Sequence, residues 1–276
     1  MVENNHIMKR LTIILFLLIG ISAKPQTADQ WFESGFEKYE NAQYSDAIKD
    51  YTECIKLAPD YSEAYYNRGL SNYFAGFFEA AVFDFNQVIK LKPGDAKAYY
   101  WMGYSLYDVG LLEDAISAYT NALYYDPNYV EAFFERGYAK YELQKYAEAI
   151  EDFNKVLTLN ANYVDAYYNR GLSNYALQNT TSAMSDFTKV VALDPEDGDA
   201  WYQIGYINND LKYYEEAIVA YSKVLIYQPD AGDAYYERGL AHFNLYEDDE
   251  ACADWEKGTS LGNELSREQY NSNCVK

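Results

Sequence analysis

The chain has 276 residues, of which 43 are acidic and 22 basic, and its net charge at pH 7 is −21. A field of this sign repels phosphate backbones and anionic lipid surfaces, so nucleic acid is excluded as a favoured partner. His6 and His242 are the only histidines, and no serine–histidine–acid group, phosphate-cradling glycine loop or metal site is predicted.

Residues 1–26 have the features of a secretory signal segment. Lys9 and Arg10 precede an apolar run from Leu11 to Ile21, and Ser22-Ala23 offers small residues for cleavage. The run is too short to span a bilayer, which needs about 20 apolar residues. We therefore predict an exported bacterial protein, periplasmic or extracellular, with no stable membrane insertion once the segment is removed. An uncleaved membrane anchor is the alternative.

Residues 27–265 repeat with a fixed period of 34 residues. In every repeat a glycine is followed after twelve residues by an alanine and after sixteen by an aromatic residue. The seven glycines are Gly35, Gly69, Gly103, Gly137, Gly171, Gly205 and Gly239. A period of this length indicates one small structural motif stacked on copies of itself.

The second repeat, residues 62–95, shows what each copy contains. Apolar residues recur at helical spacing in residues 63–74 and again in residues 79–91. Gly76 separates the two runs, and Pro93 follows the second because proline cannot continue a helix. Each repeat is thus predicted to be helix, turn, helix, turn. We expect the repeated glycine to let the second helix approach closely, and the aromatic residue to fill space between neighbouring repeats.

These residues resemble the tetratricopeptide repeat. The pattern includes an aromatic residue four before each glycine and a closing proline in five of the repeats, at Pro59, Pro93, Pro127, Pro195 and Pro229. The resemblance implies an all-α fold, a right-handed α-solenoid of seven helix-turn-helix repeats with a short C-terminal cap in residues 266–276. It also implies that the first helices line a concave groove in which peptides bind.

Two sets of residues would line this groove. The residue three before each glycine is aromatic throughout: Phe32, Tyr66, Tyr100, Phe134, Tyr168, Tyr202 and Tyr236. The residue six before the glycine is acidic in six repeats, and we select Glu63, Glu131, Asp165 and Asp199. Aromatic faces and carboxylates favour lysine, arginine and proline side chains. The expected ligand is a basic or extended peptide, and about half of the aromatic residues are expected to be core instead.

Charged pairs recur in four repeats. An arginine precedes the glycine, and an aspartate follows it after fifteen residues, in the pairs Arg68 and Asp84, Arg136 and Asp152, Arg170 and Asp186, and Arg238 and Asp254. Both members are absent together from the third and sixth repeats. We therefore predict a bridge between the two helices of a repeat, rather than four anion sites.

The three cysteines have different expected roles. Cys54 falls where a small buried residue is expected on a second helix. Cys252 lies in the last repeat and Cys274 near the C-terminus, and in an exported chain a disulfide between them would tie down the end of the stack. Two free thiols are the alternative.

The sequence as a whole predicts an exported, non-enzymatic protein that mediates protein–protein interaction through an acidic, tyrosine-rich groove, as an adaptor or scaffold without cofactor or metal. Two alternatives stay open: a carbohydrate-binding module that stacks sugars on the aromatic groove, and a scaffold that assembles with copies of itself. The identity of the partner and the oligomeric state are not predicted.

Overall fold

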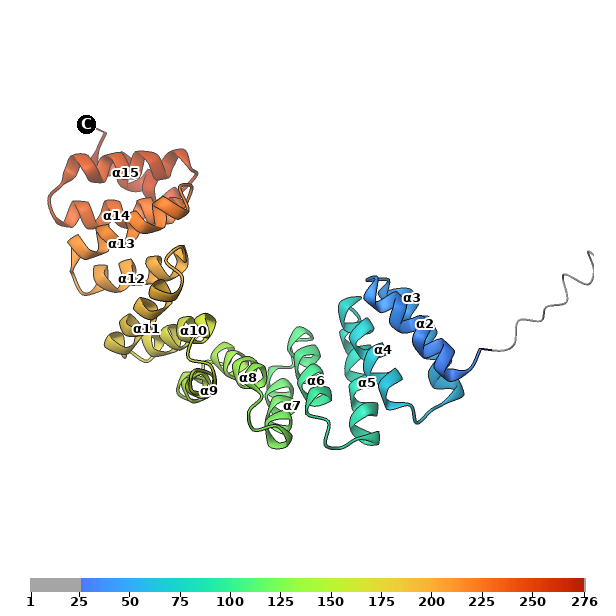
Figure 1. Cartoon of the computed structure of the whole chain (residues 1–276). Coiled ribbons are helices and arrows are strands. Elements are labelled where there is room, and N and C mark those ends of the chain that lie inside the picture. The colour runs from blue at the N-terminus through green and yellow to red at the C-terminus, as the bar shows by residue number, and fades with distance from the viewer. Residues whose placement is uncertain (1–25, 276) are drawn as a thin grey trace, which may run out of the picture. The chain divides into compact units, whose positions relative to one another are not determined.

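The structure is a computed structural model that describes residues 26–275 (Figure 1). The predicted signal segment therefore lies outside the described residues, apart from Gln26. Across residues 26–275 there are fifteen α-helices and no strand. They are α2 (Ala28–Glu40), α3 (Tyr44–Leu57), α4 (Ser62–Phe74), α5 (Phe78–Leu91), α6 (Ala96–Asp108), α7 (Leu112–Tyr125), α8 (Val130–Glu142), α9 (Tyr146–Leu159), α10 (Val164–Ala176), α11 (Thr180–Leu193), α12 (Gly198–Asp210), α13 (Tyr214–Tyr227), α14 (Gly232–Asn244), α15 (Asp248–Ser260) and α16 (Glu264–Asn273). The predicted all-α class is confirmed.

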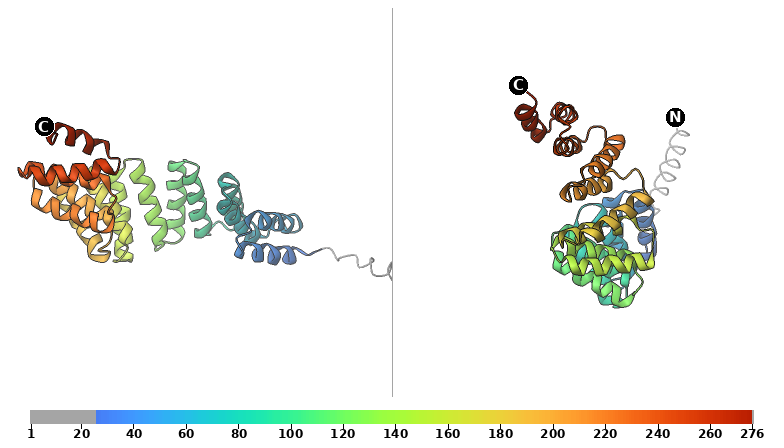
Figure 2. Two further views of the ribbon diagram at one scale, coloured as in Figure 1. Left: turned by 90° about the horizontal axis from the view of Figure 1, so that it is seen from above. Right: turned by 90° about the vertical axis from the view of Figure 1, so that its left-hand side faces the viewer.

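The helices form two compact bodies, each built in the same way. The N-terminal body ends at Val109 and holds α2–α6, and the C-terminal body begins at Gly110 and holds α7–α16. Within each body the two helices of a repeat pack as a hairpin, as α4 and α5 or α10 and α11 do. Each second helix also packs on the first helix of the next repeat, as α9 does on α10 (Figure 2). Stacked hairpins are the arrangement that the 34-residue period predicts.

The repeated glycine brings the two helices of a hairpin together. A methyl group added at Gly69 would lie 2.9 Å from Phe85 Cε1, and one added at Gly171 would lie 2.9 Å from Phe187 Cε1. Both phenyl rings are fully buried. The second-helix aromatic residue therefore lies directly over the glycine of its own repeat, in addition to any role between neighbouring repeats. Close approach explains why this helical position excludes a side chain.

A left-handed residue ends the first helix of each repeat for which the turn is described. It stands seven residues after the repeated glycine, and its φ angle lies between 56° and 88°. Gly76 and Gly110 adopt this conformation without steric cost. Non-glycine residues adopt it in the other five repeats: Ala42, Gln144, Gln178, Lys212 and Tyr246. In the six repeats that lie within one body, the sharp turn lets the second helix fold back on the first after three linking residues.

Helix α16 closes the C-terminal body. It begins at Glu264, two residues before the predicted boundary of the cap, because the Asn263 side chain accepts a hydrogen bond from the Ser266 amide (2.7 Å). The helix packs on α15 and α14, and a methyl group at Gly258 would lie 2.3 Å from Ser266 Oγ. A disulfide joins Cys252 to Cys274, whose Cα atoms are 5.7 Å apart. Cys54 is free and buried, as its position on the second helix predicts.

None of the helices between residues 26 and 275 combines the length and apolar character that crossing a membrane requires.

Candidate functional site

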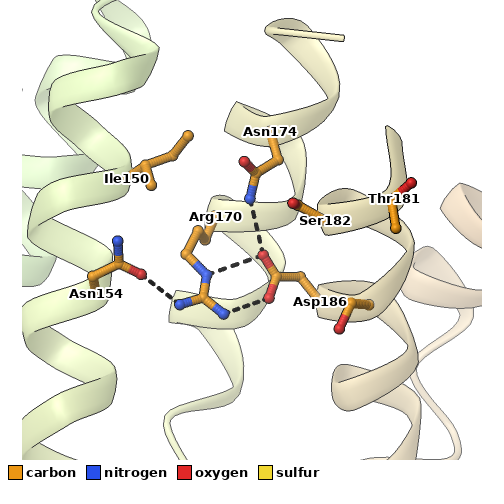
Figure 3. Close-up of a pocket in the computed structure, with 8 residues that line it drawn as sticks. Ile150, Asn154, Arg170, Asn174, Thr181, Ser182 and Asp186 are labelled. Atoms are coloured by element: carbon orange, nitrogen blue, oxygen red, sulfur yellow. Dashed lines mark hydrogen bonds and ion pairs between the residues drawn. The ribbon is translucent and has the colours of Figure 1, made fainter. Parts of the chain in front are cut away.

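The four predicted arginine–aspartate pairs are present in the structure. In the fifth repeat Arg170 Nε donates to Asp186 Oδ2 (3.0 Å) and Arg170 Nη2 donates to Asp186 Oδ1 (2.5 Å), as Figure 3 shows. Arg68, Arg136 and Arg238 make the same two-pronged contact with Asp84, Asp152 and Asp254. The aspartates are buried, and each pair joins the first helix of a repeat to the second. The predicted bridge is confirmed.

The same arginines also connect neighbouring repeats, which the sequence analysis did not predict. Arg170 Nη1 donates to Asn154 Oδ1 (2.5 Å) on the second helix of the preceding repeat. Arg68, Arg136 and Arg238 reach Thr52, Thr120 and Ser222 in the same way. Each guanidinium also lies about 5.5 Å from the centre of the aromatic ring three residues earlier, as Arg68 does over Tyr65. Polar residues 16 positions before each arginine were the sequence signal for this link.

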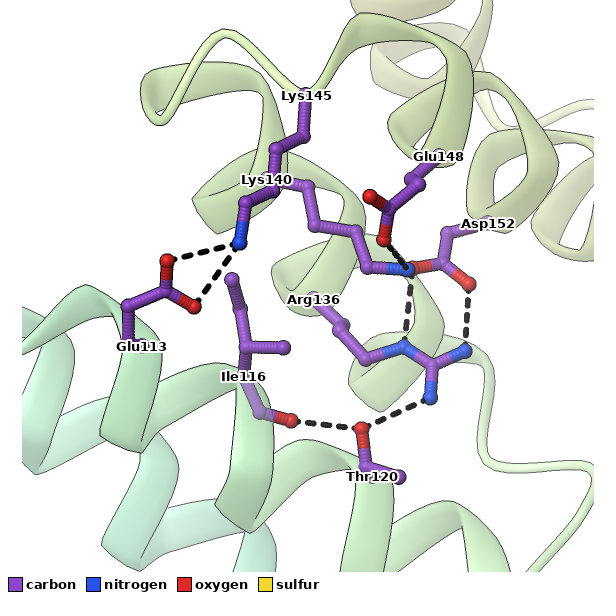
Figure 4. Close-up of polar contacts among 8 residues, drawn as sticks. All are labelled: Glu113, Ile116, Thr120, Arg136, Lys140, Lys145, Glu148 and Asp152. Carbon is purple, nitrogen blue, oxygen red and sulfur yellow. Dashed lines mark hydrogen bonds and ion pairs between the residues drawn. The ribbon is translucent and has the colours of Figure 1, made fainter.

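A third donor on the first helix completes the aspartate's surroundings. Asn72 Nδ2 donates to Asp84 (2.9 Å) and Asn174 Nδ2 to Asp186 (3.2 Å), while Lys140 Nζ lies 2.9 Å from Asp152 (Figure 4). In the first repeat, which lacks the arginine, Ser34 and Lys38 bond to Asp50 at 2.6 and 2.5 Å. In the sequence, a polar residue three positions after the repeated glycine marks this third donor.

A cavity of about 410 Å³ opens beside Arg170, lined also by Asn154, Asn174, Ser182 and Asp186 (Figure 3). All three nitrogens of the Arg170 guanidinium already donate to protein groups. Because these contacts hold the stack together, we assign this side of the molecule a structural role.

In the C-terminal body, the predicted ligand-binding residues share one surface of α8, α10, α12 and α14, which we call the first-helix face. Its aromatic members are Phe134, Tyr168, Tyr202 and Tyr236, and all four are half-buried. Tyr168 packs edge-on against Phe187 with ring centres 5.6 Å apart, and Tyr202 packs against Tyr221 at 5.5 Å. Phe134 lies between Phe153 and Tyr163, at 5.9 and 5.1 Å. These rings are therefore shared between the core and the surface.

The acidic members of the first-helix face are exposed. Glu131, Asp165 and Asp199 stand at the same place in three successive repeats, one helical turn before Phe134, Tyr168 and Tyr202. No lysine or arginine of the described chain forms an ion pair with any of the three. This part of the face therefore presents carboxylates that a partner is free to neutralise.

The corresponding aromatic residues of the N-terminal body make internal contacts of the same kind. Phe32 stacks on Tyr61 with ring centres 5.0 Å apart, and Tyr66 packs on Phe85 at 5.7 Å. Tyr100 lies 5.6 Å from Trp101, ring centre to ring centre. Glu63 Oε1 forms an ion pair with Lys92 Nζ, at a distance of 2.5 Å. The carboxylates without ion pairs thus favour the C-terminal body as the candidate site.

Two polar residues at the sixth and seventh repeats add to this face. Asn209 Nδ2 donates to Glu237 Oε2 (3.3 Å) and to the Glu237 carbonyl oxygen (3.4 Å). Burial raises the pKa of Glu237, and the neighbouring Asp233 carboxylate raises it further. Neither residue was selected from the sequence, although Asn209 is the only non-aromatic residue at its repeat position.

Nothing in residues 26–275 groups three or more histidine, cysteine, aspartate or glutamate side chains in a way that could hold a metal ion.

Family models of the tetratricopeptide repeat match most of the repeated region. One matches residues 35–96 and 71–129, a second matches residues 164–197 and 198–230, and a model described as a TPR repeat matches residues 137–178. No curated protein matches the chain.

Several solved structures are similar to it. The C-terminal part of a TPR repeat-containing protein from Cytophaga hutchinsonii is 17% identical, covers 89% of this chain and 100% of its own, and has a TM-score of 0.77. MamA is 27% identical with a TM-score of 0.57, over 60% of this chain and 97% of its own. YrrB, described as a TPR protein with an unusual peptide-binding site, is 23% identical with a TM-score of 0.60, over 68% of this chain and 97% of its own.

Proposed function

Since the chain belongs to the tetratricopeptide repeat family, we propose that it is a non-enzymatic adaptor or scaffold that binds an extended basic peptide of another protein on its first-helix face. One observation carries the proposal. Aromatic rings half-open to solvent alternate with exposed carboxylates that have no ion-pair partner in the described chain, in three successive repeats of the C-terminal body.

The chemistry of this row favours a cationic partner. Tyr168 and Tyr202 offer ring faces held by Phe187 and Tyr221, so little side-chain freedom is lost on contact. Asp165 and Asp199 lie one turn away and attract ammonium or guanidinium groups. The equal spacing of the repeats suits an extended chain, which places side chains at regular intervals. YrrB, which has a similar fold, is described as having a peptide-binding site, and this supports a peptide as ligand here.

We further propose that the protein acts outside the cytoplasm. The apolar run in residues 11–21 and the bonded pair Cys252 and Cys274 both suit an exported chain, because structural disulfides persist in oxidising compartments. Secretion of the chain fused to a reporter, with and without residues 1–26, tests this part of the proposal.

An array of seven-residue peptides with net charges from −3 to +3 tests the binding function. We expect binding to rise with positive charge and to weaken as salt concentration rises. The variant Glu131→Gln, Asp165→Asn, Asp199→Asn should lose most of this binding. The control variant Glu151→Gln, Glu215→Gln, Glu216→Gln removes the same charge from second helices and should retain it.

Equal binding by the two variants would contradict the proposed face. Salt-independent binding of oligosaccharides, with no binding of any peptide, would instead favour the carbohydrate-binding alternative, since stacking of sugars on aromatic rings changes little with ionic strength.

A further inference from the structure

The junction of the sixth and seventh repeats departs from its neighbours at three positions. Asn209 stands where the other repeats of the C-terminal body carry Tyr141, Tyr175 and Phe243. Tyr221 stands where the fourth and fifth repeats carry Phe153 and Phe187. Glu237 stands where the two preceding repeats carry the neutral residues Asn169 and Gln203. Asn209 is the only non-aromatic residue at its repeat position, whereas a tyrosine also stands at the Tyr221 position in the third repeat and a glutamate at the Glu237 position in the fourth.

The fold brings these three departures together. Asn209 donates to the Glu237 carboxylate and carbonyl. Tyr221 is fully buried, and its ring packs edge-on against Tyr202. Burial raises the pKa of Tyr221, and the Glu237 carboxylate raises it further, while Asn209 lowers it.

This polar group is incompletely satisfied within the protein. Asn209 Oδ1 is buried and has no hydrogen-bond partner among the described residues. An unsatisfied buried polar atom costs about 1–3 kcal/mol. Stability alone does not explain the asparagine at position 209, where the other repeats of the C-terminal body carry an aromatic residue.

A cavity of about 250 Å³ adjoins them, between α12 and α14. Asp199 and Asp233 are exposed at its edge, and Tyr202 forms one wall. The carboxylate of Asp233 accepts one hydrogen bond, from Asn263 Nδ2 (2.6 Å). Together with Glu237, this place holds three carboxylates, and no lysine or arginine among the described residues forms an ion pair with any of them. Arg238, the nearest arginine in sequence, is engaged by Asp254.

We propose that the cavity bounded by Asp199, Tyr202 and Asp233, with Glu237 beside it, binds the side chain of a lysine or arginine of the partner peptide. This inference rests on the proposed function and gives the peptide a fixed register on the first-helix face. The carboxylates neutralise the cation, and the open side of the Tyr202 ring contacts its aliphatic or guanidinium part. The fourth–fifth and fifth–sixth junctions carry Asn169 and Gln203 at the place of Glu237, so they lack the third carboxylate.

Two matched peptides test the site in the intact protein. One is acetyl-Gly-Pro-Arg-Pro-Gly-amide, and the other has citrulline, an uncharged analogue of the same shape, in place of arginine. We expect the arginine peptide to bind about tenfold more tightly, which corresponds to about 1.4 kcal/mol. Glu237→Gln and Asp233→Asn should each remove most of that difference, whereas Glu215→Gln, an exposed change on α13, should leave it intact. Circular dichroism checks that the variants keep their helical content.

Three results would overturn the assignment. The first is equal affinity for the arginine and citrulline peptides. The second is an arginine preference that survives Glu237→Gln and Asp233→Asn but disappears in the Glu131→Gln, Asp165→Asn double variant, in which case the proposed function stands and only this site falls. The third is Glu237-dependent binding of Ca²⁺ alone, which would assign the carboxylates to a metal ion.

Discussion

The aspartate fifteen residues after the repeated glycine is the residue on which most polar contacts of a repeat converge. Asp186 accepts from Arg170 and Asn174, and the same arginine reaches back to Asn154 of the preceding repeat. One buried carboxylate therefore holds its own hairpin together and links it to the one before. Removal of a single partner should leave charge uncompensated in the interior.

The repeats allow this to be tested with a matched pair of variants. Arg170→Met leaves Asp186 with an amide partner only, whereas Arg136→Met leaves Lys140 Nζ 2.9 Å from Asp152. We expect Arg170→Met to lower the free energy of unfolding by about 3 kcal/mol and Arg136→Met by clearly less. Urea denaturation measures both.

The double variant Arg170→Met, Asp186→Ala serves as the control and should be more stable than Arg170→Met alone, because it leaves no unpaired charge. Equal losses in the two single variants would show that Lys140 does not compensate Asp152.

Glu237 gives a pH-dependent prediction. Burial, together with Asp233, raises its pKa in the folded chain, so the folded state binds this proton more tightly than the unfolded state does. The ionised carboxylate therefore destabilises the fold above its folded-state pKa, and the penalty is relieved as the pH falls below it. Glu237→Gln should raise Tm at pH 7 and give little gain at pH 4, relative to Glu215→Gln at each pH. A gain of the same size at both pH values would argue against this linkage.

At the scale of the helix, the turn within each hairpin is the element with stored strain. Gln178 and Lys212 adopt the left-handed conformation that Gly76 and Gly110 adopt in other repeats. The conformation costs a non-glycine residue roughly 1–2 kcal/mol, and the greater freedom of glycine in the unfolded chain offsets about half of this.

Gln178→Gly should therefore stabilise the protein by about 0.5–1 kcal/mol, while Gly76→Ala should destabilise it by a similar amount. Thermal unfolding of the two variants measures both changes. Apart from its own chain neighbours, no atom lies within 4 Å of a methyl group built at Gly76. A loss of stability in Gly76→Ala therefore reports backbone strain rather than a packing clash. If Gln178→Gly lowered stability and Gly76→Ala raised it, the backbone of the turn would have relaxed in the variants.

The last helix depends on a covalent tether. The disulfide closes a loop with a sequence separation of 22 residues and holds α16 against α15. Replacing both Cys252 and Cys274 with serine should lower stability by roughly 3 kcal/mol in the chain-entropy description, and α16 should lose protection in hydrogen exchange first.

Thiol titration of the denatured, unreduced protein provides the independent check. Cys54 alone should react, because the structure leaves it as the free cysteine. Three reactive thiols would show that the tether is absent in solution.

For the molecule as a whole, the sequence predicted the contacts that recur from one repeat to the next. The close approach of the second helix at Gly69 and the pairing of Arg68 with Asp84 connect residues of one repeat, so each leaves the same pattern in copy after copy. The place of Phe85 over Gly69 was not predicted, because the sequence assigned this aromatic residue to the space between neighbouring repeats. Contacts between repeats were missed, because the Arg170 to Asn154 bond depends on how neighbouring hairpins cross. The Asn209 to Glu237 contact occurs once, and a single departure from the repeat carries no periodic signal.

The sequence also could not predict that the aromatic residues of the first-helix face are half-buried. Tyr168 and Tyr202 stand at positions that serve the core and the surface together, and only the packing on Phe187 and Tyr221 shows how much of each ring stays open. Alanine at these positions would remove core contacts as well as ligand contacts. Charge-neutralising changes at Asp165 and Asp199 are therefore the cleaner test of binding.

Photo-crosslinking tests the central claim, that the first helices of the C-terminal body bind an extended basic peptide. An arginine-containing peptide with a benzoylphenylalanine at one end, irradiated with the intact protein, reports by mass spectrometry which helices it touches. We expect crosslinks on α8, α10, α12 and α14. Crosslinks confined to α9, α11 and α13 would contradict the assignment of the binding face.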